Sequence, residues 1–277
     1  MRPSSRRRTL LTALAVTLLP AARADDGVRH IKALFICGGC CHDYDHQKHI
    51  VTEGISKTAG DKVQIDWTIA DDGNRVRPHK AEVYKDPNWY KGFDIVVHDE
   101  CFGEVTDTDF IAGILKAHGE GKVPAVNLHC TMHSYKASGT KWTYRDWYEF
   151  TGIESHNHGA QMPIALKYID HDHPISAGLG DWTTVKEELY NNFEILPTAH
   201  PLLRGKQSWT DKKSGAEQSA DYVVAWTNLY RGTRVFSTTL GHDNQTCADP
   251  RYLTLVTRGF LWALGITDLP APPAEQK

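Results

Sequence analysis

The sequence contains no uncharged hydrophobic run long enough to cross a bilayer. Its leading candidate, Thr9–Ala22, falls short of the roughly 20 residues that a spanning helix needs. Arg2 and the arginines at 6–8 precede this stretch, and Ala22-Arg23-Ala24 follows it with the small-x-small form of a cleavage site. We therefore predict a signal peptide at residues 1–24 and a periplasmic or secreted mature protein without a membrane span.

The export route stays open at this level. Ser5-Arg6-Arg7-Arg8-Thr9-Leu10 approximates a twin-arginine signal, although Thr9 stands where that signal usually has an aromatic residue. A general secretory signal with several arginines fits the same segment.

An excess of positive charge is also missing. Without the five arginines of residues 1–24, the 31 basic residues fall to 26 against 34 acidic ones, a net charge near −8. Such a balance argues against nucleic acid and anionic membranes as partners, because both bind through clustered Lys and Arg.

Internal repeats and inter-domain linkers are absent as well. Removing 24 residues from 277 leaves 253, enough for one domain with a sizeable core, which we place at residues 25–267. The Pro- and Ala-rich residues 268–277 are predicted to be a flexible tail. The chain has only six cysteines, which allow 15 disulfide connectivities, so no pairing can be assigned.

What the chain does have is an alternation of strand and helix patterns. The predicted strands of the first half are His30–Cys37, Val63–Ala70, Phe93–His98 and the apolar run at the start of Pro124–Tyr135. A helix through Thr58 and another with Thr106 as its N-cap lie between them. This rhythm predicts an α/β fold with a parallel sheet.

The second half is less regular. We predict an aromatic-rich helix at Trp142–Phe150, a loop at Ile153–Gly159 carrying His156 and His158, and a final helix. That helix has Asp249 as its cap and Pro250 in its first turn, and Gly265 ends it. Further strands are predicted at Met162–Ile169, Tyr222–Trp226 and Arg234–Leu240, and the stretch Val185–Ile195 contains Glu187-Glu188-Leu189-Tyr190.

Reactive side chains collect where strands end, at the edge where open α/β sheets bind ligands. They are Cys37, Cys40, Cys41 and His42 after the first strand; His98, Glu100 and Cys101 after the third; His129, Cys130 and His133 after the fourth; and His242 and Cys247 after the last.

Two side chains compete for the reactive position after the fourth strand. A strand-to-helix elbow exposes its central residue and needs small neighbours two positions away. Cys130 would have Leu128 and Met132 as those neighbours, whereas His129 has Asn127 and Thr131, so we favour His129. His129 and His133 have the spacing of a metal-binding helix but lack the acid of the zinc-protease motif.

Histidines and carboxylates supply two kinds of chemistry here. His129 and His242, with Glu188 or Asp243, can form a general acid/base set. Neutral imidazoles with carboxylates suit zinc or a similar divalent cation equally well. The i, i+2 pairs His156/His158 and His171/His173 place two imidazoles on one side of a strand and offer further ligands.

Taken together, these motifs resemble the ThuA-like (trehalose utilisation) family over roughly residues 31–266. The resemblance rests on Gly38-Gly39 with Cys41-His42-Asp43-Tyr44, Leu128-His129 with His133, His158-Gly159, His173-Pro174-Ile175, Glu188-Leu189-Tyr190 and Gly241-His242. It implies a flavodoxin-like, class I glutamine amidotransferase-like fold, with a mainly parallel sheet and helices on both faces. It also implies a carbohydrate substrate, a glycoside or 3-keto-glycoside, and an amidotransferase elbow occupied by a histidine-containing segment.

Three hypotheses follow. The first is an exported hydrolase or lyase that acts on a glycoside or 3-keto-glycoside; the second is a non-catalytic sugar-binding protein; the third is a cysteine-dependent, amidase-like hydrolase acting through Cys130. For the first we assign catalysis to His129, His242 and Glu188, a divalent metal to His129, His158 and His242, and substrate binding to His42, Asp43, Tyr44, His133 and Tyr190.

Overall fold

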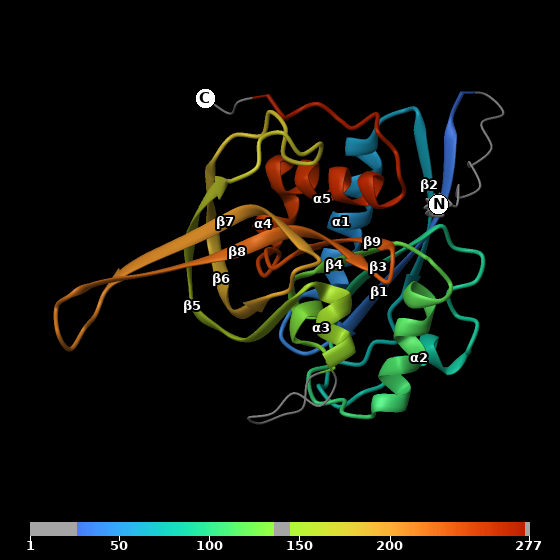
Figure 1. The fold of residues 1–277 in the computed structure, drawn as a ribbon, viewed down its shortest axis with the longest axis horizontal. Coiled ribbons are helices and arrows are strands. Elements are labelled where there is room, and N and C mark those ends of the chain that lie inside the picture. The colour runs from blue at the N-terminus through green and yellow to red at the C-terminus, as the bar shows by residue number, and fades with distance from the viewer. Residues whose placement is uncertain (1–26, 136–144, 275–277) are drawn as a thin grey trace, which may run out of the picture.

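The computed structural model describes residues 27–135 and 145–274, which build one nine-stranded mixed sheet (Figure 1). The strand order is β2-β1-β3-β4-β9-β8-β7-β5-β6. The parallel half comprises β1 (Arg29–Gly39), β2 (Val63–Ala70), β3 (Ile95–Cys101), β4 (Ala125–Leu128) and β9 (Thr233–Thr238). The antiparallel half comprises β5 (Ile153–Tyr168), β6 (Trp182–Ile195), β7 (Ala199–Thr210) and β8 (Glu217–Tyr230).

Helices cover both faces of the parallel half. Figure 1 shows α1 (Tyr44–Ala59) and α5 (Pro250–Ala263) on one face, and α2 (Thr108–Gly119) and α3 (Arg145–Thr151) on the other. Strand β1 serves both cores, because successive side chains point to opposite faces. Phe35 packs with the α1/α5 core, and Ile36 packs with the α2/α3 core. The α/β fold class predicted from the sequence is confirmed.

Three short helices complete the description: η1 (Glu82–Lys85), η2 (His129–His133) and α4 (Asn244–Ala248). The final helix begins and ends as predicted. Asp249 accepts a hydrogen bond from the Arg251 N–H at 2.8 Å, and Gly265 follows the helix with a φ of +79°. The predicted cap of α2 was wrong by one residue, since Asp107 rather than Thr106 accepts from the N–H groups of Asp109 and Phe110, each at 3.1 Å.

The prediction of a loop at Ile153–Gly159 was wrong, and β7 was not predicted. Residues 153–159 belong to β5, which pairs with β6 through several register shifts. Much of this segment is exposed and polar, so it carries no hydrophobic alternation from which a strand could be recognised. Cross-strand pairing supplies its order, and β7 and β8 continue into a long hairpin that projects from the sheet (Figure 1).

Within the described residues, the predicted aromatic-rich helix is α3, which covers Arg145–Thr151; Trp142 and Tyr144 lie outside the described residues. Residues 268–274 have no regular secondary structure, and Arg258 donates a hydrogen bond to the Pro270 carbonyl at 2.8 Å. Within the described ranges, no helix has both the length and the apolar character needed to cross a membrane.

Gly39, at the end of β1, is expected to tolerate no side chain. Its φ is +89°, and an added Cβ would lie 2.3 Å from the Cys101 carbonyl oxygen of the neighbouring strand. Gly39→Ala should lower the free energy of unfolding by about 1–3 kcal/mol, the usual cost of overpacking. Gly60→Ala is the matched control, since Gly60 has a φ of +77° but open space around it. Equal losses for the two variants in urea denaturation would contradict the steric explanation.

Candidate active site

The parallel strands deliver their following residues to one edge of the sheet. His42 lies just beyond β1, Cys101 ends β3, His129 follows β4 and His242 follows β9. These four strands are neighbours in the sheet and run in the same direction. Their carboxyl ends therefore converge, as the sequence analysis predicted.

His129 occupies the elbow between β4 and η2. Its φ of +39° is a left-handed value that non-glycine residues seldom adopt, and its side chain is buried. The Thr239 carbonyl only accepts hydrogen bonds, so His129 Nδ1 donates to it at 2.6 Å. That contact fixes the tautomer and leaves Nε2 available to the site.

Glu188 in β6 connects three histidines. Its Oε2 lies 3.5 Å from His129 Nε2 and 3.5 Å from His158 Nε2, and its Oε1 lies 3.3 Å from His242 Nδ1. Gln161 donates to Glu188 Oε1 at 3.0 Å, which orients the carboxylate. The antiparallel half of the sheet thus brings an acid to the edge that the parallel half supplies with imidazoles.

Burial and charge separate the pKa values of the two main histidines. Burial disfavours protonation of His129, but its hydrogen bond to Glu188 and the nearby negative charges overcome this and raise its pKa to about 9. The opposite occurs at His242, where burial and the charge of His129 lower the pKa to about 4. Burial opposes ionisation of Glu188, yet His129 holds the pKa of that carboxyl at about 2.

A third histidine, His42, completes a compact triangle. Its ring centroid lies 4.6 Å from that of His129 and 4.9 Å from that of His242, while His129 and His242 are 5.6 Å apart. One nitrogen from each of the three rings lies within 4.8 Å of the other two. Nδ1 of His42 is buried and makes no hydrogen bond to the described residues, while the buried Nδ1 of His242 lies 3.3 Å from Glu188 Oε1. Three imidazoles that lie this close together, one of them with an unpaired buried nitrogen, fit a bound cation.

His158 and Tyr190 border this triangle. The His158 side chain is 40% exposed, so it reaches solvent, in contrast to the buried His129. Tyr190 is buried, and its hydroxyl lies 3.4 Å from His129 Nε2. The rings of Tyr190 and His133 stack at 3.8 Å, and His133 Nε2 lies 2.9 Å from Ser155 Oγ. His133 therefore supports Tyr190 from behind.

Asp43 and Tyr44 lie further from the histidine triangle. Asp43 is exposed and accepts a hydrogen bond from Asn244 at 2.8 Å. Tyr44 is buried, and its hydroxyl donates to the Cys40 carbonyl at 3.4 Å. Both residues position the segment that carries His42.

Sequence reasoning missed the role of Glu187. Its buried carboxylate accepts hydrogen bonds from the N–H groups of Gly241, His242 and Asp243 at 3.4, 3.2 and 3.2 Å. Burial raises the pKa of Glu187. The adjacent acids Glu187 and Glu188 were visible in the sequence, but no local pattern shows that one holds the backbone at His242 while the other faces the imidazoles.

Cys130 is buried directly behind the histidines. Its Sγ lies 2.9 Å from His42 Nε2 and 2.8 Å from Cys101 Sγ. Burial, together with the neighbouring Cys101, raises the pKa of Cys130 well above the ordinary thiol value. A buried neutral thiol is a poor nucleophile.

Glu188→Gln is expected to change how stability depends on pH in metal-free protein. Because folding raises the His129 pKa, protonated His129 stabilises the folded state below about pH 6.5, and this stabilisation is lost as the pH rises through about 9. Because folding lowers the Glu188 pKa, ionised Glu188 stabilises the folded state above about pH 4.5, and this stabilisation is lost as the pH falls through about 2. The difference between wild type and variant should therefore be largest between about pH 4.5 and 6.5. Urea denaturation in the presence of a chelator measures it, and a difference independent of pH would contradict the pairing.

The fold and the site together define a class of protein. A five-stranded parallel unit covered by helices on both faces, with the left-handed residue His129 in the turn after one strand, is a flavodoxin-like α/β fold. A ThuA-like protein from Parabacteroides merdae matches 88% of this chain and 94% of its own, with 19% identity and a TM-score of 0.61. A glutamine amidotransferase from Thermotoga maritima covers 85% of this chain and 99% of its own at 8% identity, with a TM-score of 0.44.

The family can be stated as well. The family model ThuA, described as trehalose utilisation, matches residues 46–263, and the chain belongs to this family. Among the curated proteins that were compared, none matches the sequence. The resemblance inferred from the motifs is confirmed, and a carbohydrate-related role follows from the family.

Proposed function

We propose that this protein is an exported, metal-dependent enzyme that cleaves a glycoside or 3-keto-glycoside by hydrolysis or elimination. The observation that carries the proposal is the convergence of His42, His129 and His242 beside Glu188. Family membership supplies the carbohydrate class. Export rests on the charged and apolar pattern of residues 1–24.

The residues fit a divalent cation of the zinc type. His42, His129 and His242 would hold it, and three neutral imidazoles are a common ligand set of catalytic zinc. His129 Nδ1–H already bonds to a backbone carbonyl, the arrangement that orients metal-ligating histidines. This ligand set differs from the one predicted from the sequence in one residue, because His42 takes the place of His158, which contacts Glu188 instead. When bound, the cation would polarise a carbonyl or activate a water molecule.

Proton transfer falls to Glu188 and His158. The two side chains touch at 3.5 Å, and His158 reaches solvent, so a proton taken at the site can pass outward. Cleavage of a 3-keto-glycoside by elimination needs removal of the proton beside the carbonyl and protonation of the departing glycosidic oxygen. Glu188, whose carboxylate faces His129, His158 and His242, supplies the base.

Purified protein should be assayed on glycosides and 3-keto-glycosides, with and without a chelator. The proposal expects turnover that the chelator abolishes and added zinc restores. Turnover insensitive to the chelator would instead favour direct acid/base catalysis, in which protonated His129 and neutral His242 act as the pair. Sugar binding without turnover would contradict the enzyme proposal and support a non-catalytic sugar-binding protein.

Cys130→Ser separates the metal proposal from cysteine catalysis. Cys130 contacts His42, so its replacement is expected to lower turnover by about 10–100-fold at most, as for a group that supports a ligand. Loss of a true nucleophile costs about 10⁶-fold. Steady-state kinetics on the best substrate decides between the two, and a loss of the larger size would revive the amidase-like hypothesis.

A further inference from the structure

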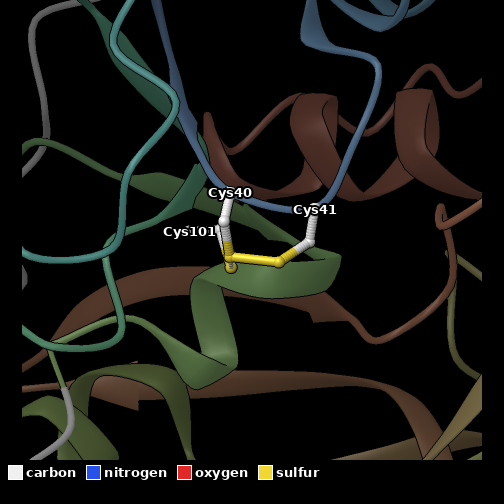
Figure 2. Close-up of side chains that lie close together, drawn as sticks. All are labelled: Cys40, Cys41 and Cys101. Carbon is white, nitrogen blue, oxygen red and sulfur yellow. Dashed lines mark hydrogen bonds between the residues drawn. A yellow bond between two sulfur atoms is a disulfide. The ribbon is translucent and has the colours of Figure 1, made fainter.

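Four sulfur atoms lie in a row between the protein surface and the histidine triangle. Cys40 and Cys41 form a disulfide between adjacent residues just beyond β1. Cys101 Sγ lies 3.6 Å from Cys40 Sγ, and Cys130 Sγ lies 2.8 Å from Cys101 Sγ. Figure 2 shows Cys101 behind Cys40, with its sulfur close to the disulfide.

The row runs from solvent to the interior. Cys41 is exposed and Cys40 is partly buried, whereas Cys101 and Cys130 are buried. Cys101 and Cys130 are free thiols in this arrangement. Neighbouring sulfurs in the order Cys41, Cys40, Cys101 and Cys130 are therefore bonded or close to contact distance. A thiol from solution can reach this row at Cys41, its exposed end.

We propose that these four cysteines form a thiol–disulfide exchange site, in which one disulfide moves between Cys40–Cys41 at the surface and Cys101–Cys130 beside the active site. The sulfur positions support this exchange whether or not the protein cleaves glycosides.

Two exchange steps connect the ends. In the first, the Cys101 thiolate attacks Cys40 Sγ; the Cys40–Cys101 bond forms, the Cys40–Cys41 bond breaks, and Cys41 leaves as a thiolate that takes up the proton released by Cys101. In the second, Cys130 Sγ attacks Cys101 Sγ while His42 Nε2, 2.9 Å away, accepts the Cys130 proton; the Cys101–Cys130 bond forms, the Cys40–Cys101 bond breaks, and Cys40 leaves as a thiolate that takes up that proton. One disulfide and two thiols are present before and after, so no external oxidant or reductant is consumed.

Arg77 supports the first step. Its Nε lies 3.3 Å from Cys40 Sγ, and its Nη2 lies 4.0 Å from Cys41 Sγ. A guanidinium beside both sulfurs stabilises the thiolate that departs. The inner disulfide would connect the end of β3 to η2, one residue from His129, so the redox state of the surface pair would be transmitted to the elbow.

The class of reaction partner follows from the exposed end. A small thiol or a dithiol protein can attack Cys41 Sγ, whereas the buried pair is shielded from it. Reduction of the inner disulfide would therefore proceed through Cys40 and Cys41.

Disulfide mapping tests the proposal in the mature protein. Wild type, Cys41→Ser, Cys101→Ser and the control Cys37→Ser are equilibrated in glutathione redox buffer, quenched with N-ethylmaleimide in denaturant, digested without reductant and analysed by mass spectrometry. Circular dichroism confirms that each variant is folded. Cys37 is a buried free cysteine outside the row, so its variant should match wild type.

In Cys41→Ser, we expect an intramolecular disulfide from Cys101 to either Cys40 or Cys130. In Cys101→Ser, we expect the disulfide to be confined to Cys40–Cys41, with Cys130 fully alkylated. Cys41→Ser protein in which Cys40 carries glutathione while Cys101 and Cys130 are both alkylated would overturn the proposal. So would wild type in which Cys130 stays alkylated at every glutathione ratio.

Discussion

His129→Ala should lower turnover on the preferred glycoside or keto-glycoside by about 10²–10⁴-fold, the range lost with a positioned catalytic imidazole. The residue lies at the one place where the elbow, the Glu188 carboxylate and the other two imidazoles meet. Its Nδ1 is committed to Thr239, so a neighbouring side chain cannot replace its Nε2 without moving β4. Steady-state kinetics with matched protein concentrations measures the effect.

The control for this experiment is His49→Ala. His49 is exposed on α1, so its replacement also removes an imidazole but leaves the site intact. Its turnover should stay within error of wild type. A His129→Ala protein that is folded and retains wild-type turnover would remove the elbow from the mechanism.

Zinc should raise the melting temperature of chelator-treated protein by about 8–16 °C when present at 1,000 times its dissociation constant. Binding to the folded state alone at that concentration stabilises it by about 4.1 kcal/mol, and each kcal/mol moves the melting temperature of a chain this size by about 2–4 °C. Differential scanning calorimetry measures the shift without any need for a substrate.

Single alanine variants identify the ligands in the same experiment. His42→Ala, His129→Ala and His242→Ala should each abolish most of the shift, because the remaining two imidazoles bind far more weakly. His158→Ala should keep it, because His158 contacts Glu188 rather than the triangle. The reverse result, with His158 required and His42 dispensable, would support the ligand set inferred from sequence alone.

Most of the parallel half could be predicted from the sequence. The strand β2 has the predicted bounds, and the cap, first turn and final glycine of α5 lie where local rules place them. These features depend on neighbouring residues in the chain, so short-range periodicity and capping chemistry are sufficient. The antiparallel half was harder to predict, because β7 and the first part of β5 are ordered by cross-strand pairing rather than by a hydrophobic pattern of their own.

The candidate site, too, has features that depend on neighbouring residues in the chain and features that depend on tertiary contacts. Steric reasoning about Asn127 and Thr131 selected His129 over Cys130, and the positive φ of His129 agrees with that choice. The sequence alone also placed His242 at the end of the last parallel strand. Both conclusions follow from a residue's immediate neighbours.

Only the tertiary structure decided which groups meet. His42 and Glu188 are separated from His129 by long stretches of chain, and their approach depends on strand order and on the register of β5 with β6. The same holds for the row of sulfurs, in which Cys101 and Cys130 reach Cys40 only because β1, β3 and β4 are adjacent. Local sequence determines what each strand end carries; the packing of distant segments determines which of those ends form a site.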